Sequence, residues 1–162
     1  VIIGTGQQEN MLTQRVNAAG ADGRITFIDR LPHSEIRAAH ARANIYVSLN
    51  RLGQLSNANL EVMSGGHCMV IPDARLEQKI DLVTRELLPN DAVLRIPTDE
   101  REVPALVDAI VALADDPDRR AAMTAKLKAA AARFIPAWED RVAEEITLLE
   151  TAAARSTDRA AA

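Results

Sequence analysis

The side chains best suited to chemistry are concentrated between Ser48 and Asp73, in the stretch SLNRLGQLSNANLEVMSGGHCMVIPD. A loop of small and polar residues there leads into a predicted helix, which Ser56 or Asn57 can cap because a short oxygen-bearing side chain accepts a first-turn N–H. The first turn of a helix presents N–H groups and a partial positive charge, which suits a phosphate. We expect Glu61 inside this first turn, where its carboxylate either only complements the helix dipole or accepts hydrogen bonds from the vicinal hydroxyls of a sugar ring.

Two apolar strands are predicted to position this helix. Ile45–Leu49 precedes the loop, and Cys68–Ile71 follows the glycine pair Gly65-Gly66, which ends the helix because glycine adopts the left-handed conformation required there. Strand, turn, helix and strand form the smallest unit of a parallel sheet. Open parallel sheets bind ligands at the carboxyl ends of their strands, which is where this helix begins.

A second candidate is the turn Gly4-Thr5-Gly6, which follows a predicted first strand. With Asp29 at the end of the second strand to hold a ribose hydroxyl, this layout is that of a dinucleotide fingerprint. The third glycine of that fingerprint would fall at Glu9, however, and a carboxylate there would repel a pyrophosphate, which disfavours NAD. Two interpretations remain open: a tight turn with no ligand, or a turn that a nucleotide sugar or another ligand only touches.

Strands alternate with helices along the whole chain, which predicts an α/β fold with a mostly parallel sheet. Between residues 74 and 88 the pattern is mixed, and no element is predicted there. The predicted strands are Val1–Ile3, Arg24–Ile28, Ile45–Leu49, Cys68–Ile71 and Ala92–Ile96. The first predicted helix follows Gly6, and the last begins at Pro136. Between them, helices are predicted over Ile36–Ala43, after Ser56, over Asp99–Asp115 and over Arg119–Phe134.

Composition limits the partners of the chain. Its 162 residues are 48% hydrophobic but only 2% aromatic, so the core must be aliphatic. The net charge of −4 argues against nucleic acid or an anionic membrane as the main partner, because both select basic patches. No apolar run approaches the roughly 20 residues that span a bilayer. We expect a cytoplasmic protein with one domain over residues 1–150, a frayed tail over 151–162, and, since Val1 lies within a strand, a longer parent protein.

No metal or cofactor is predicted. The single cysteine, Cys68, excludes an internal disulfide and lies in a strand pattern, where it is most simply a buried hydrophobic residue. The histidines His33, His40 and His67 have neither the spacing nor the neighbours of a zinc site. His33 lies beside a helix start and either caps that helix or faces a ligand. The sequence contains no nucleophile elbow and no P-loop, so hydrolase and NTPase functions have no support.

Five segments in order resemble the C-terminal, donor-binding half of the retaining GT-B glycosyltransferases of the sucrose-synthase-like group. The resemblance covers nearly the whole chain, from Val1 to about Leu149, and includes Trp138 in the last segment. The five segments are VIIGTGQQENML, RITFIDRLPHSEI, NIYVSLNRLGQLSNANLEVMSGGHCMVIPD, IPTDEREVPALVDAIVALADDPDRRAAM and FIPAWEDRVAEEITLLE.

This resemblance implies a Rossmann-like open sheet with helices on both faces, as one half of a GT-B fold with its first strand and helix missing. It implies a nucleotide diphosphate sugar as donor, with Glu61 on the nucleotide ribose. The backbone from Asn57 through Ala58 and Asn59 to Leu60 would face the diphosphate and sugar. Gly4 and Gly6 would border the cleft, and Phe27 and Ile28 would lie near the base. No catalytic residue is assigned.

The sequence also departs from the family. Gly53 stands where the first glutamate of the E-x7-E motif is expected, so sugar contacts would come from Gln54, Asn57 or Asn59. The usual glycine pair after the fourth strand is replaced by Asp73-Ala74-Arg75-Leu76. The Arg and Lys that neutralise the leaving diphosphate, and the N-terminal acceptor domain, would lie upstream of Val1. Two functions therefore stay open: the donor-binding domain of a sugar transferase, or a non-catalytic glycosyltransferase-like module for binding or assembly.

Overall fold

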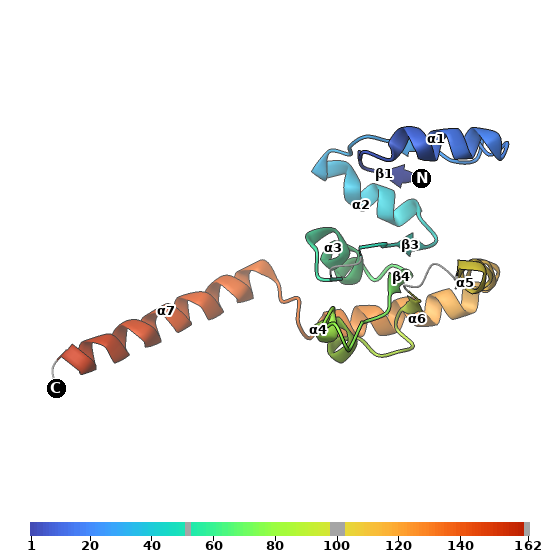
Figure 1. Cartoon of the computed structure of the whole chain (residues 1–162). Coiled ribbons are helices and arrows are strands. Elements are labelled where there is room, and N and C mark those ends of the chain that lie inside the picture. Colours follow the sequence, from blue (N-terminus) through green and yellow to red (C-terminus); the bar gives the residue numbers. More distant parts are fainter. Residues whose placement is uncertain (51–52, 98–102, 161–162) are drawn as a thin grey trace. The chain divides into compact units, whose positions relative to one another are not determined.

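A computed structural model describes residues 1–50, 53–97 and 103–160, with side chains described as far as Ala154 (Figure 1). The first residues of the predicted helix Asp99–Asp115 therefore lie outside the described part of the chain. The chain forms two compact units, Val1–Ala43 and Asn44–Ala162.

The first unit contains one pair of parallel strands and two helices. Strand β1 (Ile2–Ile3) pairs with β2 (Phe27–Ile28), with Ile2 opposite Phe27 and Ile3 opposite Ile28. Helices α1 (Glu9–Ala18) and α2 (His33–Arg42) follow the two strands and contain no buried residue. An apolar strand at this position would be expected to be buried, but Ile2 and Ile3 are 42% and 49% exposed, since a unit of this size buries little apolar surface by itself.

The second unit is built on a three-stranded parallel sheet. Strands β3 (Tyr46–Val47), β4 (Met69–Pro72) and β5 (Leu94–Ile96) lie in the order β3-β4-β5. Both strand pairs are parallel, with Val47 opposite Val70 and Val70 opposite Leu94. Each strand lies within a predicted strand or extends one residue beyond it. The parallel pairing confirms the predicted parallel arrangement.

In the described part of this unit, the strands of the sheet are connected and followed by helices (Figure 1). Helix α3 (Asn57–Gly65) connects β3 to β4, and the short helix α4 (Leu82–Leu87) connects β4 to β5. Helix α5 (Val103–Asp115) follows β5 and is succeeded by α6 (Pro117–Ala131), where Asp116 caps α6 by accepting the Arg119 N–H at 2.8 Å.

The core consists of two apolar clusters that share strand β4. Met69 and Ile71 belong to one cluster, which includes Val62 and Met63 of α3 and the C-terminal half of α6. Val70 belongs to the other, with Leu113 of α5 and the N-terminal half of α6. Because successive side chains of a strand point to opposite faces, the two clusters occupy the two faces of the sheet. Helices therefore cover both faces, as predicted.

The last helix, α7, spans Trp138–Ala160 and so includes most of the residues predicted to form a frayed tail. Its apolar side chains are accessible to solvent: Trp138 is 75% exposed, Ile146 51% and Leu149 71%. In the part of the chain that the structure describes, no helix is both long and apolar enough to cross a membrane.

Candidate functional site

Helix α3 begins and ends as its sequence predicts. Ser56 is the N-cap, with extended backbone, and its Oγ accepts the N–H of Asn59 at 3.4 Å. Gly66 is the C-cap, with a left-handed φ of 66°. A Cβ at Gly66 would lie 2.9 Å from the Cβ of Lys128, so glycine is needed there for close packing as well as for backbone conformation. The helix is thereby fixed at both ends beside the sheet.

Glu61 lies in the second turn of α3, which corrects the prediction that it lies in the first. Ser56 is the cap and Asn57 the first helical residue, so the first turn contains no acidic residue. Glu61 nevertheless shares a helix face with Asn57 and Ala58, because residues three and four apart are neighbours on a helix. Its side chain is partly exposed and belongs to neither core cluster. Glu61 therefore lies outside the two core clusters, on the helix face that carries the first helical residues.

Two backbone amides at the start of α3 are open to a ligand. Among the described residues, the N–H groups of Asn57 and Ala58 have no acceptor, and both residues are exposed. The next two amides are already occupied by Ser56, whose Oγ accepts from Asn59 and whose backbone oxygen accepts from Leu60 at 2.9 Å. The Leu60 side chain packs against the first core cluster. An anion at this helix start would therefore meet the amides of Asn57 and Ala58.

The side chains of Asn59 and Gln54 are buried and bond to each other. Each is 1% exposed, and the Asn59 amide nitrogen donates to Oε1 of Gln54 and to its backbone oxygen, both at 3.0 Å. The same nitrogen lies 3.2 Å from Ser48 Oγ, and Asn59 Oδ1 accepts the Tyr46 hydroxyl at 3.0 Å. The direct sugar contacts predicted for Gln54 and Asn59 stay a prediction. The geometry gives these side chains a positioning role, tying the loop before α3 to strand β3.

The buried network continues into the segment before α4. Asp81 Oδ1 accepts from the Gln54 N–H at 3.0 Å and from the Thr84 hydroxyl at 2.6 Å. Asp81 also has a left-handed φ of 58°, which is uncommon for a residue other than glycine. Neither Asp81 nor Thr84 was predicted to have a structural role. An aspartate three residues before a threonine, at the start of an apolar run, is the signal that could have indicated an ordered turn there.

Tyr46 joins the network to Glu61. Burial raises the pKa of the Tyr46 phenol, and the negative charge of Glu61 raises it further. The carboxylate and the phenol are thus electrostatically coupled, although they belong to different elements. Tyr46 was not among the predicted site residues, because a tyrosine in a strand is most often a core residue.

Gly53 occupies a conformation that favours glycine. Its φ is +155°, and a Cβ built there would have no atom within 4 Å. A glutamate at this position would fit sterically but would strain the backbone. The loop backbone at position 53 therefore favours glycine over the glutamate that the E-x7-E motif would place there.

Of the predicted site residues of the first unit, Phe27 and Ile28 form β2, and Gly4 and Gly6 lie in the turn that follows β1. The Gly4 N–H donates to the backbone oxygen of Ile28 at 2.9 Å, and Gly6 begins the turn into α1 by accepting the Glu9 N–H at 3.1 Å. Gly4 has a φ of +125°, and both glycines have open space where a Cβ would be. Phe27 is partly buried. The turn thus has the exposure that a ligand requires.

His33 lines a cavity of about 550 Å³ in the first unit, together with Arg30, Leu31, Pro32 and Ile36. It is the first residue of α2, and Pro32 occupies the N-cap position without a side-chain hydrogen bond. The alternative that His33 faces a ligand is therefore compatible with its place in the structure. Cys68 is buried, and burial raises the pKa of its thiol. Within the described residues, no three His, Cys, Asp or Glu side chains are grouped to hold a metal ion.

Comparison with known proteins gives a structural likeness and no sequence-level match. No protein-family profile matches the sequence, and no curated protein matches it significantly. Among solved structures, a sucrose-phosphate synthase from Thermosynechococcus elongatus superposes with a TM-score of 0.72 at 16% identity, over 94% of this chain. The two share a fold. The chain spans 38% of that synthase. The match confirms the predicted fold class, a Rossmann-like α/β arrangement as in one half of a GT-B fold.

Proposed function

We propose that the chain is the nucleotide-sugar-binding part of a glycosyltransferase. The observation that carries this proposal is the helix start of α3, where two open amides and the partly exposed Glu61 share one helix face after the carboxyl end of β3. The amides suit a diphosphate and the carboxylate suits the hydroxyls of a ribose. The fold shared with a sucrose-phosphate synthase supports the assignment to this class of enzyme.

In this proposal the amides of Asn57 and Ala58 bind the diphosphate, Glu61 binds the nucleotide ribose, and the buried Asn59 and Gln54 side chains hold the loop between β3 and α3. The acceptor and the groups that stabilise the leaving diphosphate would lie in sequence outside this chain. Positive charge at the phosphates is what lowers the barrier to loss of a nucleotide diphosphate. We therefore expect the isolated chain to bind nucleotide without transferring sugar.

Nucleotide titration tests the proposal. We expect calorimetry to show saturable binding of UDP or GDP, and Glu61→Ala to weaken it about 10- to 100-fold, since a hydrogen bond to a charged group contributes about 1.5–3 kcal/mol. Glu77→Ala is the matched control, because Glu77 is an exposed carboxylate outside α3. Equal losses in the two variants would contradict a specific role for Glu61. Measurable sugar transfer by the chain alone would contradict the proposal that groups needed for transfer lie outside it.

The second candidate is a non-catalytic module with the same fold. Gly53 favours it, because the residue at the first hallmark glutamate position is a glycine in a backbone conformation that disfavours glutamate. This candidate predicts that neither UDP nor GDP binds the chain, and that the longer protein containing it transfers no sugar.

A further inference from the structure

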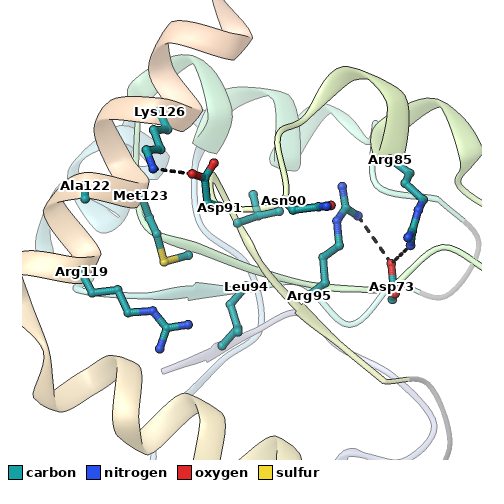
Figure 2. Close-up of a pocket in the computed structure, with 11 residues that line it drawn as sticks. Asp73, Arg85, Asn90, Asp91, Leu94, Arg95, Arg119, Ala122, Met123 and Lys126 are labelled. Carbon is teal, nitrogen blue, oxygen red and sulfur yellow. Dashed lines mark hydrogen bonds and ion pairs between the residues drawn. The ribbon is translucent and has the colours of Figure 1, made fainter.

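The unit Asn44–Ala162 contains a polar cavity that the start of α3 does not line. Its volume is about 570 Å³, and it is lined by residues of α4, β5, α6 and the loop before β5 (Figure 2). Strand β5 is an edge of the three-stranded sheet, so this cavity runs along the sheet edge. None of the residues proposed to bind the nucleotide lines it.

Cations outnumber carboxylates in this cavity. Its lining includes the cations Arg85, Arg95, Arg119 and Lys126, and the carboxylates Asp73 and Asp91. Lys126 is paired with Asp91, while Arg85 and Arg95 share a single oxygen of Asp73, at 2.9 and 4.0 Å. The side chain of Arg119 makes no ion pair with any residue that the structure describes. The cavity is therefore locally positive in a chain whose net charge is −4.

Arg95 is the least expected of these cations. Its side chain is only 10% exposed, and its Nη2 donates to the backbone oxygen of Thr84 at 3.2 Å. Its Nε and Nη1 are buried and have no hydrogen-bond acceptor in the described part of the chain. Burial lowers the pKa of this guanidinium, which nearby Asp73 and Asp81 partly oppose. A buried cation with two unsatisfied donors is costly unless an acceptor reaches it.

Apart from Asn90, the rest of the lining is apolar. Val93 and Leu94 of the β5 segment and Met123 of α6 form part of the wall, and Figure 2 shows Met123 between Lys126 and Arg119. A volume of about 570 Å³ is in the range of small-molecule sites. Guanidinium groups match the oxygens of a phosphate in geometry and charge better than ammonium groups do. The cavity thus combines cationic side chains, which Figure 2 shows on either side of Leu94, with an apolar wall.

We propose that this cavity binds a small phosphate monoester, whose phosphate replaces Asp73 as the ion-pair partner of Arg95, while its carbon skeleton lies against Val93, Leu94 and Met123, on the side of the cavity that Arg119 lines. The covered nitrogens of Arg95 are reached by rotation of its guanidinium and displacement of the exposed Arg85–Asp73 pair. This site is separate from the proposed nucleotide site, so either can fail without the other.

The experiment is an NMR titration of the whole chain with phenyl phosphate and with inorganic phosphate, at constant ionic strength so that screening does not change. We expect amide shifts concentrated in residues 90–95 and 119–126, and binding of phenyl phosphate at least tenfold tighter than that of inorganic phosphate, because only the ester buries apolar surface. Shifts spread over the surface, or no shifts at high ligand concentration, would overturn the proposal. Localised shifts with equal affinity for the two ligands would also overturn it, since the apolar wall would then have no role.

Arg119→Ala is the decisive variant. Arg119 is exposed and its side chain has no ion-pair partner among the described residues, so the variant should fold, and we expect it to bind phenyl phosphate about tenfold more weakly. Arg133→Ala removes the same charge outside the cavity and should change the affinity less than twofold. Equal losses in the two variants would show that the phosphate responds only to overall charge. Unchanged nucleotide binding in Arg119→Ala would separate this site from the proposed nucleotide site.

Discussion

At the scale of single residues, the electrostatic coupling between Glu61 and Tyr46 links the candidate site to the buried network. The phenol hydroxyl donates to Asn59, which is buried, while its electrostatic partner Glu61 is partly exposed. A change at the surface carboxylate therefore alters the ionisation of a group inside the protein.

The first prediction concerns this coupling. Burial is the larger cause of the raised Tyr46 pKa and the Glu61 charge is the smaller one, so Glu61→Gln should lower the pKa without returning it to the ordinary value of 10.0. Absorbance titration measures this cleanly, because Tyr46 is the only tyrosine. Glu77→Gln should leave the pKa unchanged. A pKa that rises or stays constant in Glu61→Gln would contradict the coupling.

The same shift has a consequence for stability. The folded-state pKa lies above the unfolded value of 10.0, so the contribution of Tyr46 is fully present below pH 10.0 and is lost as the pH rises through the folded-state pKa. Urea unfolding followed over this alkaline range should show the loss, and Tyr46→Phe should remove this part of the pH dependence.

Local residue chemistry was predictable where one residue type satisfies one backbone requirement. Ser56 and Gly66 were placed correctly because capping depends on a short oxygen-bearing side chain and on a left-handed φ. The positions of Gln54 and Asn59 were not predictable. Their burial depends on Tyr46, Ser48 and Asp81, which lie on other elements, and polar side chains in a loop are ordinarily expected to face solvent.

At the scale of elements, the two glycines that end α3 differ in what they require. Gly66 has a left-handed φ, and its added Cβ would meet the Cβ of Lys128 at 2.9 Å. An added Cβ at Gly65 would meet Nε2 of His67 at 2.7 Å, which is the far end of a flexible side chain.

We predict that Gly66→Ala lowers the free energy of unfolding by about 1–2 kcal/mol or more, because alanine is disfavoured in the left-handed region and Lys128 packs against this position. Gly65→Ala should change it by less than about 1 kcal/mol, since alanine favours the helix and the His67 ring can turn away. Urea denaturation followed by circular dichroism measures both variants. Equal destabilisation would show that the left-handed φ is not the decisive constraint.

The predicted elements were most accurate where hydrophobic periodicity is strong. The helix that became α5 has an apolar stripe, and its end at Asp115 was predicted. Helix α4 was not predicted, because it is six residues long, begins after a left-handed Asp81, and lies in a segment of mixed polarity. Strand lengths were overestimated, because apolar residues continue beyond the paired region: β3 pairs only Tyr46 and Val47 of the five predicted residues.

At the scale of the whole molecule, burial is distributed unevenly. All buried residues that the structure describes lie between Ser48 and Ala131, and the unit Val1–Ala43 has none. We predict that amides of β4 and the C-terminal half of α6 exchange slowest with deuterium, and that those of α1 and α2 exchange by local opening of much lower free energy. Hydrogen exchange with mass spectrometry tests this. Equal protection in the two units would contradict it.

The fold class could be predicted at this scale because alternating strands and helices leave few arrangements other than a parallel sheet. The cavity beside β5 could not be predicted from the sequence. Arg85, Arg95 and Arg119 lie on three different elements, and each alone resembles an ordinary surface cation in the sequence. Only folding brings them to one sheet edge.

The exposure of Trp138 also determines which optical signal can follow this protein. It is the only tryptophan, and 75% of it is accessible in the folded state. Its indole is surrounded by water before and after denaturation, so its emission should barely shift when the core around β4 melts. A flat fluorescence trace during heating would therefore report the surroundings of one helix start, and would be no sign that the protein resists unfolding.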